Sequence, residues 1–152
     1  MNRQRSLFAA CAAVYVVSLA GVYARAAAPA QPQPQPQPRS GGWTLPPNAE
    51  EEKNPLAGDA KAVAAGKELY LKNCKRCHGP GGLGDGPDAD PDSAQDMDLT
   101  VAKRAARNPD GVVFYKLWNG RTKPKMPAFK DDLTKDEAWQ IVSFVQTLRQ
   151  KQ

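Results

Sequence analysis

The side chains best suited to binding a cofactor are concentrated in one pentapeptide, Cys74-Lys75-Arg76-Cys77-His78. Its pattern is C-x-x-C-H, the attachment signature of a c-type haem. Two thiols three positions apart lie on one side of a helical turn, where they can add across the two vinyl groups of a haem. The imidazole of the next residue, His78, is then placed to become an axial ligand of the iron. The motif therefore predicts covalent haem attachment at Cys74 and Cys77.

Three other interpretations of the cysteine pair are weaker. A structural zinc site needs four Cys or His ligands, whereas the chain has three cysteines and one histidine, and Cys11 lies in an apolar N-terminal segment. A thioredoxin-like redox pair needs a preceding strand, but the residues before Cys74 have a helical pattern. A disulfide between Cys74 and Cys77 would close too short a loop to stabilise the fold much.

The second axial ligand must come from a residue other than histidine, because His78 is the only histidine of the sequence. Met126 is favoured, since it lies in a loop between two expected helices that can cross the distal face of a haem. Met97, a lysine and an open coordination site are the alternatives. Ligation by His78 and Met126 would fill both axial positions, so the iron would exchange electrons without binding a substrate. These residues predict an electron carrier, not an enzyme.

The haem motif is embedded in a helical pattern, and we expect an all-α fold of three to five helices without strands. Apolar spacing and capping residues predict helices over 59–73, from Asn108-Pro109 to Asn119, and over 135–150. A glycine-rich loop, 79–87, and an acidic loop, 88–98, separate the first two helices. Gly66 has a cost of about 1 kcal/mol within a helix, so we expect another helix to approach it closely.

The residues before the haem domain divide into two segments. Residues 1–26 have a basic start, an apolar run over 6–24 and the sequence Ala24-Arg25-Ala26, which together predict a secretory signal peptide. The run is also long enough to be a retained membrane anchor, and both alternatives stay open. Residues 27–53, with four Gln-Pro pairs, predict a flexible linker, so the domain is expected over 54–152. Both alternatives place the domain in the periplasm of a bacterium.

The net charge of +5 does not indicate a nucleic-acid-binding protein. Residues 1–26 contribute three arginines and no acid, which leaves 18 basic against 16 acidic residues, a charge of +2. The remaining charge is polarised, because residues 50–100 carry 11 acids and 6 bases, whereas residues 101–152 carry 5 acids and 11 bases. Such a distribution can orient the docking of a partner.

Several further motifs together make the chain similar to the class I cytochrome c family, in its bacterial monohaem branch. The matching elements lie within residues 59–149: Gly66 and Tyr70 before CKRCHG, the GLGDGP loop, DLT at 98–100, MPAF at 126–129, and Trp139, Ile141, Val142 and Phe144. The resemblance implies thioether bonds at Cys74 and Cys77, and His78 and Met126 as axial ligands of one haem c. It also implies that the carbonyl of Pro87 accepts a hydrogen bond from the His78 ring.

The same resemblance implies that Gly66 and Tyr70 pack against Trp139 and Phe144 where the first and last helices cross. The expected function is transfer of single electrons between periplasmic or membrane redox proteins by a monomeric carrier. An alternative is the haem-bearing subunit of a larger dehydrogenase or oxidase complex, and a weaker one is an open-iron gas sensor or peroxidase. A partner with an acidic patch could dock on a basic rim formed by Lys75, Arg76, Arg121, Lys123 and Lys125.

Overall fold

The computed structural model describes residues 38–39, 42–123 and 125–149. The expected signal or anchor, 1–26, and the Gln-Pro pairs of the linker up to Gln37 lie outside the described residues, so those two predictions are untested. Within the described part of the chain, no helix combines the length and the apolar composition that crossing a membrane requires.

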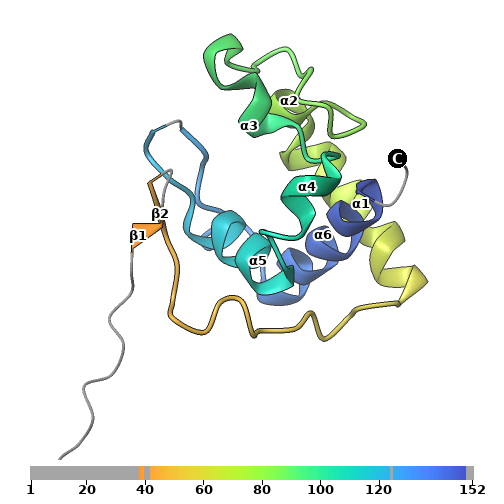
Figure 1. Cartoon of the computed structure of the whole chain (residues 1–152). Coiled ribbons are helices and arrows are strands. Elements are labelled where there is room, and N and C mark those ends of the chain that lie inside the picture. Colours follow the sequence, from red (N-terminus) through yellow and green to blue (C-terminus); the bar gives the residue numbers. More distant parts are fainter. Residues whose placement is uncertain (1–37, 40–41, 124, 150–152) are drawn as a thin grey trace, which may run out of the picture. The chain divides into compact units, whose positions relative to one another are not determined.

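The fold is all-α, as predicted, and three helices of ten or more residues form its frame (Figure 1). They are α1 (Ala60–Asn73), α5 (Asp110–Asn119) and α6 (Lys135–Leu148). Shorter helical segments join α1 to α5: α2 (Lys75–His78), η1 (Pro91–Ser93), α3 (Ala94–Met97) and α4 (Ala102–Ala105). These single turns raise the number of described helices above the expected three to five.

Two short strands precede the helices, although no strand was expected. Strand β1 (Pro38–Arg39) pairs antiparallel with β2 (Trp43–Thr44). Each strand has only two residues, which is too short to produce the alternating apolar pattern by which strands are recognised in a sequence.

The helix ends follow from capping residues, with one difference from expectation. The side chain of Asp59 accepts a hydrogen bond from Lys61 N at 2.8 Å, and Thr134 and Glu137 form the predicted capping box. Asn108 does not cap α5, because Pro109 occupies the N-cap position. The Asn108 side chain instead accepts a hydrogen bond from Lys116 Nζ at 2.5 Å.

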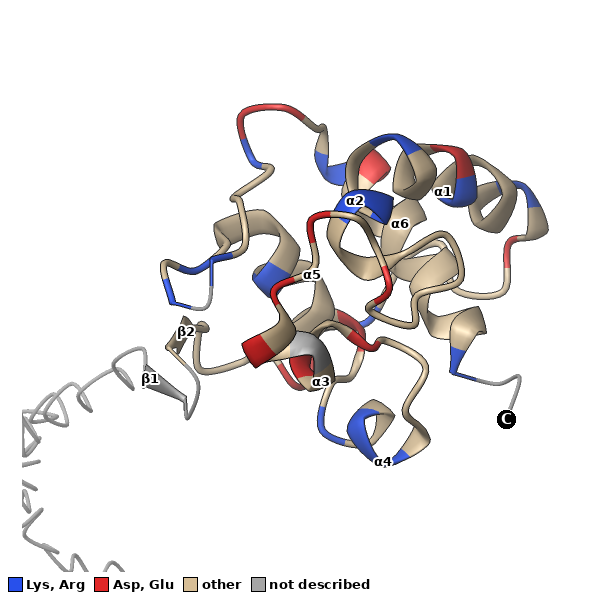
Figure 2. Ribbon diagram, turned by 90° about the horizontal axis from the view of Figure 1, so that it is seen from above, with Lys and Arg blue, Asp and Glu red and all other residues tan. Residues whose placement is uncertain are grey.

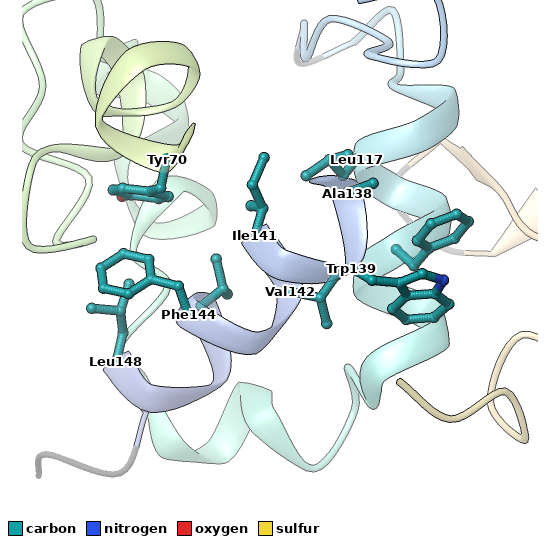
Figure 3. Packing of buried hydrophobic residues seen from close by; sticks show 10 residues of the cluster. Tyr70, Leu117, Ala138, Trp139, Ile141, Val142, Phe144 and Leu148 are labelled. Atoms are coloured by element: carbon teal, nitrogen blue, oxygen red, sulfur yellow. The ribbon is translucent and has the colours of Figure 1, made fainter. Parts of the chain in front are cut away.

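Helices α1 and α6 cross at Gly66. A methyl group at this position would lie 1.9 Å from the carbonyl oxygen of Gln140, so the close approach requires a glycine. One turn later, the rings of Tyr70 and Phe144 lie 5.1 Å apart, as expected. Trp139 does not join this contact. It stacks on Phe114 of α5 at a centroid distance of 4.2 Å. Figure 3 shows Trp139 on the opposite side of the cluster from Tyr70 and Phe144, so the expected Trp139 packing at the crossing was wrong.

Residues 42–53, here called the N-terminal strap, pack against the helices and are not a free linker (Figure 1). The side chains of Leu45 and Ala49 are 2% and 0% exposed and contact Val112 of α5. Gly111 N donates to Glu52 O at 3.1 Å. The boundary expected at residue 54 stays a prediction, but the strap packs on α5 although its short apolar pair, within a Pro-rich and acidic segment, gave no periodic signal.

Candidate functional site

The cysteine motif forms the junction of α1 and α2. Cys74 ends α1, with its N–H donating to Tyr70 O at 2.8 Å, and its carbonyl accepts from His78 N at 3.0 Å. Both motif cysteines are free thiols and partly buried. The phenol of Tyr70 donates to Gly79 O at 2.7 Å, which ties α1 to the residue after the motif. The pentapeptide is thus held at both ends by hydrogen bonds to the main chain.

The orientation of the His78 ring is set by a carbonyl group. Nδ1 of His78 lies 2.7 Å from Met97 O. Because a carbonyl only accepts, Nδ1 must carry the proton, which leaves the lone pair of Nε2 available to a metal. Burial lowers the pKa of His78, which favours this neutral form. The structure gives this role to Met97, whereas Pro87 had been expected to fill it.

The acidic loop places the Met97 carbonyl. Leu99 N donates to Gly82 O at 2.7 Å, and Leu83 pairs with Asp98 as an isolated bridge. Gly84 N donates to His78 O at 2.9 Å. These bonds fold the loop back onto the haem motif. Residues 88–98, expected only as an acidic loop between two helices, thus return the chain to His78.

Met126 is held in a narrow hairpin after α5. Arg121 N donates to Met126 O at 2.9 Å, and Met126 N donates to Arg121 O at 3.0 Å. Phe129 N donates to Leu117 O at 3.2 Å, which fixes the loop on α5. The position of the Met126 side chain therefore depends on α5 and not on the cysteine motif.

Three of the predicted site residues meet at one cavity. Cys74, His78 and Met126 all line a space of about 350 Å³, whereas Cys77, Met97 and Pro87 are not among its lining residues. Apolar side chains from α5 and α6 supply much of the wall, namely Val113, Leu117, Ile141 and Val145. The structure thus brings the haem motif and the favoured sixth ligand together, although they are far apart in the sequence.

Cationic side chains outnumber acids around this cavity. The basic lining residues are Arg104, Arg107, Lys116, Arg121 and Arg149, and the acidic ones are Asp96 and Asp98. Desolvation, followed by the nearby Arg121 and Arg149, lowers the pKa of Lys116 to about 8. The sequence analysis did not single out Lys116 and Arg149 as site residues. Each is a single cation on an otherwise apolar helix face, and this pattern could have indicated them.

A comparison with known proteins identifies the family. Residues 61–145 match the family model described as cytochrome C oxidase, cbb3-type, subunit III. The chain belongs to this cytochrome c family. No curated protein matched the sequence. Membership implies a haem c cofactor and haem-based electron transfer.

The residues of this cytochrome c domain fit that cofactor. The cavity offers a thiol, an imidazole with a free Nε2 lone pair and a thioether, and these are groups that hold a c-type haem. Its apolar wall suits the macrocycle. Its cationic residues suit an anionic ligand, and a haem carries two carboxylates.

Two of the five residues expected in the basic rim of the cytochrome c domain are paired with acids. Arg121 has a side chain only 8% exposed and an ion pair with Asp96, so it does not belong to an exposed rim. Arg76, on the basic helix α2 (Figure 2), forms a two-bond pair with Asp88 at 2.6 and 3.0 Å. Three exposed lysines remain, Lys75, Lys123 and Lys125.

Proposed function

We propose that this chain is a monohaem c-type cytochrome that carries single electrons between redox proteins. The observation that supports the proposal is the shared cavity of Cys74, His78 and Met126. These residues match the chemistry that covalent attachment and two axial ligands require.

Cys74 and Cys77 would attach the haem. Each sulfur would form a thioether bond to one vinyl carbon while the thiol hydrogen goes to the other, so neither an oxidant nor a reductant is needed. Burial, followed by the nearby Cys77, raises the pKa of the Cys74 thiol to about 12. Cys74 therefore stays a protonated thiol at neutral pH before attachment.

His78 and Met126 would leave no vacant axial position. The bound iron supplies a one-electron couple, and a thioether ligand favours its reduced state. The Met97 carbonyl holds the imidazole in one orientation, and the hairpin from Arg121 to Met126 holds the thioether. Rigid ligands of this kind suit rapid electron exchange, since little rearrangement accompanies it.

Carbon monoxide binding to the reduced holoprotein tests the proposal. We expect no change in the visible spectrum of the wild-type protein, and formation of a CO complex by Met126→Ala. Met97→Ala is the matched control, because this side chain does not line the cavity, and it should not open the iron. CO binding by the wild-type protein would contradict the proposal and favour a gas sensor or peroxidase.

Ligation of the iron by a lysine would give a different result in the CO experiment. Lys116 lines the same cavity, so it is the lysine best placed to bind the iron. If Lys116 were the ligand, Lys116→Ala would bind CO and Met126→Ala would not. The opposite result supports Met126.

A second candidate is a haem-bearing subunit of a larger oxidase complex. The description of the matched family, subunit III of a cbb3-type oxidase, favours it. Both candidates use the same haem site but differ in the permanence of the partner interface. Size-exclusion chromatography of the protein extracted from its native host separates them, because a free carrier elutes at the mass of one chain.

For a free carrier, Lys75, Lys123 and Lys125 would contact an acidic patch of the partner. Electron transfer to such a partner should slow as the ionic strength rises, since salt screens surface charges. Replacement of the three lysines by glutamine should reduce this salt dependence. A rate that does not depend on salt in the wild-type protein would contradict docking by charge.

Export from the cytoplasm is part of the proposal, since residues 1–26 have the pattern of a signal peptide or anchor. Mass spectrometry of the protein purified from its native host distinguishes the two. A chain that begins near Ala27 indicates cleavage, and an intact N-terminus in the membrane fraction indicates an anchor.

A further inference from the structure

The N-terminal strap contributes to the cavity although it precedes the matched family region. The family match begins at residue 61, whereas Trp43 and Leu45 line the same cavity as His78 and Met126. The strap is therefore a part of the site that family membership does not explain.

Trp43 contacts two cations of the cavity. Its ring centroid lies 4.3 Å from Cζ of Arg121 and 5.1 Å from Nζ of Lys116. Both distances are within the range of cation–π attraction, which contributes about 0.5–2 kcal/mol and is greater where water is excluded. One aromatic ring thus contacts two long, flexible side chains that both line the cavity.

The two cations have other contacts that keep them near this position. Lys116 Nζ donates to Asn108 Oδ1, and Arg121 Nη2 lies 3.4 Å from Asp96 Oδ2. The five bases around the cavity exceed the two acids by three charges. Such an excess is costly in a partly buried site unless the ligand is an anion.

The position of Trp43 is itself determined by anchors on two helices. Ala49 and Glu52 lie so close to α5 that a methyl group on Gly111 would be 2.3 Å from Ala49 O. Immediately after the strap, Asn54 Nδ2 donates to Ser143 Oγ at 2.8 Å and to Trp139 O at 3.2 Å. The strap is therefore a fixed part of the domain.

We propose that Trp43 is a positioning residue that holds Lys116 and Arg121 where they bind the two carboxylates of the haem. This inference rests on the proposed haem site. The ferric haem carries one more positive charge than the ferrous haem. Loss of a cation from the carboxylates leaves more negative charge near the iron and so favours the ferric state.

The experiment uses the full-length holoprotein with Trp43→Ala, Trp43→Phe, Lys116→Met and, as a control, Lys61→Met. Lys61 is exposed and outside the cavity. The measurements are the midpoint potential and the infrared difference spectrum of the haem carboxylates between the two redox states. Haem content and far-UV circular dichroism show whether each variant is loaded and folded.

We expect a lower midpoint potential and shifted carboxylate bands for Trp43→Ala and Lys116→Met. Trp43→Phe should retain most of the wild-type potential, since its ring still attracts cations, and Lys61→Met should match the wild type. The Trp43→Ala shift should be smaller when Lys116→Met is already present. This reduction distinguishes positioning of a cation from a general loosening of the fold.

Unchanged potential and carboxylate bands in a loaded Lys116→Met protein would overturn the inference, even if Trp43→Ala did not fold. Wild-type protein that attaches no haem, or that binds CO when reduced, would instead contradict the proposed function. The two failures are therefore distinguishable.

Discussion

The backbone carbonyl oxygen of Met97 lies 2.7 Å from Nδ1 of His78. The orientation of the imidazole is therefore set by the main chain of a loop that returns from Gly82 to Leu99. The side chain of Met97 is buried, with 9% exposure, but it does not line the cavity. The two methionines therefore contribute different groups to the site: Met97 contributes its main-chain carbonyl, whereas Met126 lines the cavity.

The first prediction concerns Met97→Leu. The substitution keeps the carbonyl and nearly keeps the volume, so it should cost less than about 1.5 kcal/mol of stability. The visible spectrum and midpoint potential of the holoprotein should match the wild type. Loss of the low-spin spectrum on this substitution would instead identify Met97 as an axial ligand.

The second prediction concerns the helix crossing. Gly66→Ala adds a methyl group 1.9 Å from Gln140 O, so α1 and α6 must separate. Overpacking of this kind costs about 1–3 kcal/mol, despite the roughly 1 kcal/mol by which alanine favours a helix. Urea denaturation of the holoprotein measures the change. Ala64→Gly, at an exposed position of α1, is the reciprocal control and should cost about 1 kcal/mol.

The third prediction concerns the junction between the strap and α6. Asn54 is 6% exposed, and its side chain bonds Ser143, Trp139 and Leu56. Asn54→Ala should destabilise the protein by about 1–3 kcal/mol, because buried polar partners lose their hydrogen bonds. Asn48→Ala, on the exposed part of the strap, should change stability by less than about 0.5 kcal/mol. Equal effects would mean that Asn54 does not anchor the strap.

The fourth prediction concerns pH. Hydrogen bonds from the Thr134 backbone and side chain lower the pKa of Glu137 below its ordinary value of 4.5. A carboxyl whose pKa is lower in the folded state stabilises the protein above its unfolded pKa, and this contribution disappears as the pH falls through the folded value. Thr134→Ala and Glu137→Gln should both reduce the loss of unfolding free energy between about pH 5 and pH 3. A slope equal to that of the wild type would contradict the role of the capping box.

The local features of this protein were predictable because short segments encode them. C-x-x-C-H predicted which residues would attach a haem, and apolar spacing with the capping box at Thr134 predicted the long helices. Composition alone excluded a second histidine ligand. Each of these inferences depends on chemistry within a few positions of one residue.

Tertiary structure decided which residues surround the site. The carbonyl at His78 comes from Met97 and not Pro87, because the loop pairs with Gly82 on its return. Trp139 stacks on Phe114 and not at the crossing, since α5 packs beside α6. Trp43 reaches Lys116 because the buried Leu45 and Ala49 hold the strap on α5. Contacts between distant segments depend on how helices pack, and no local pattern in the sequence specifies that.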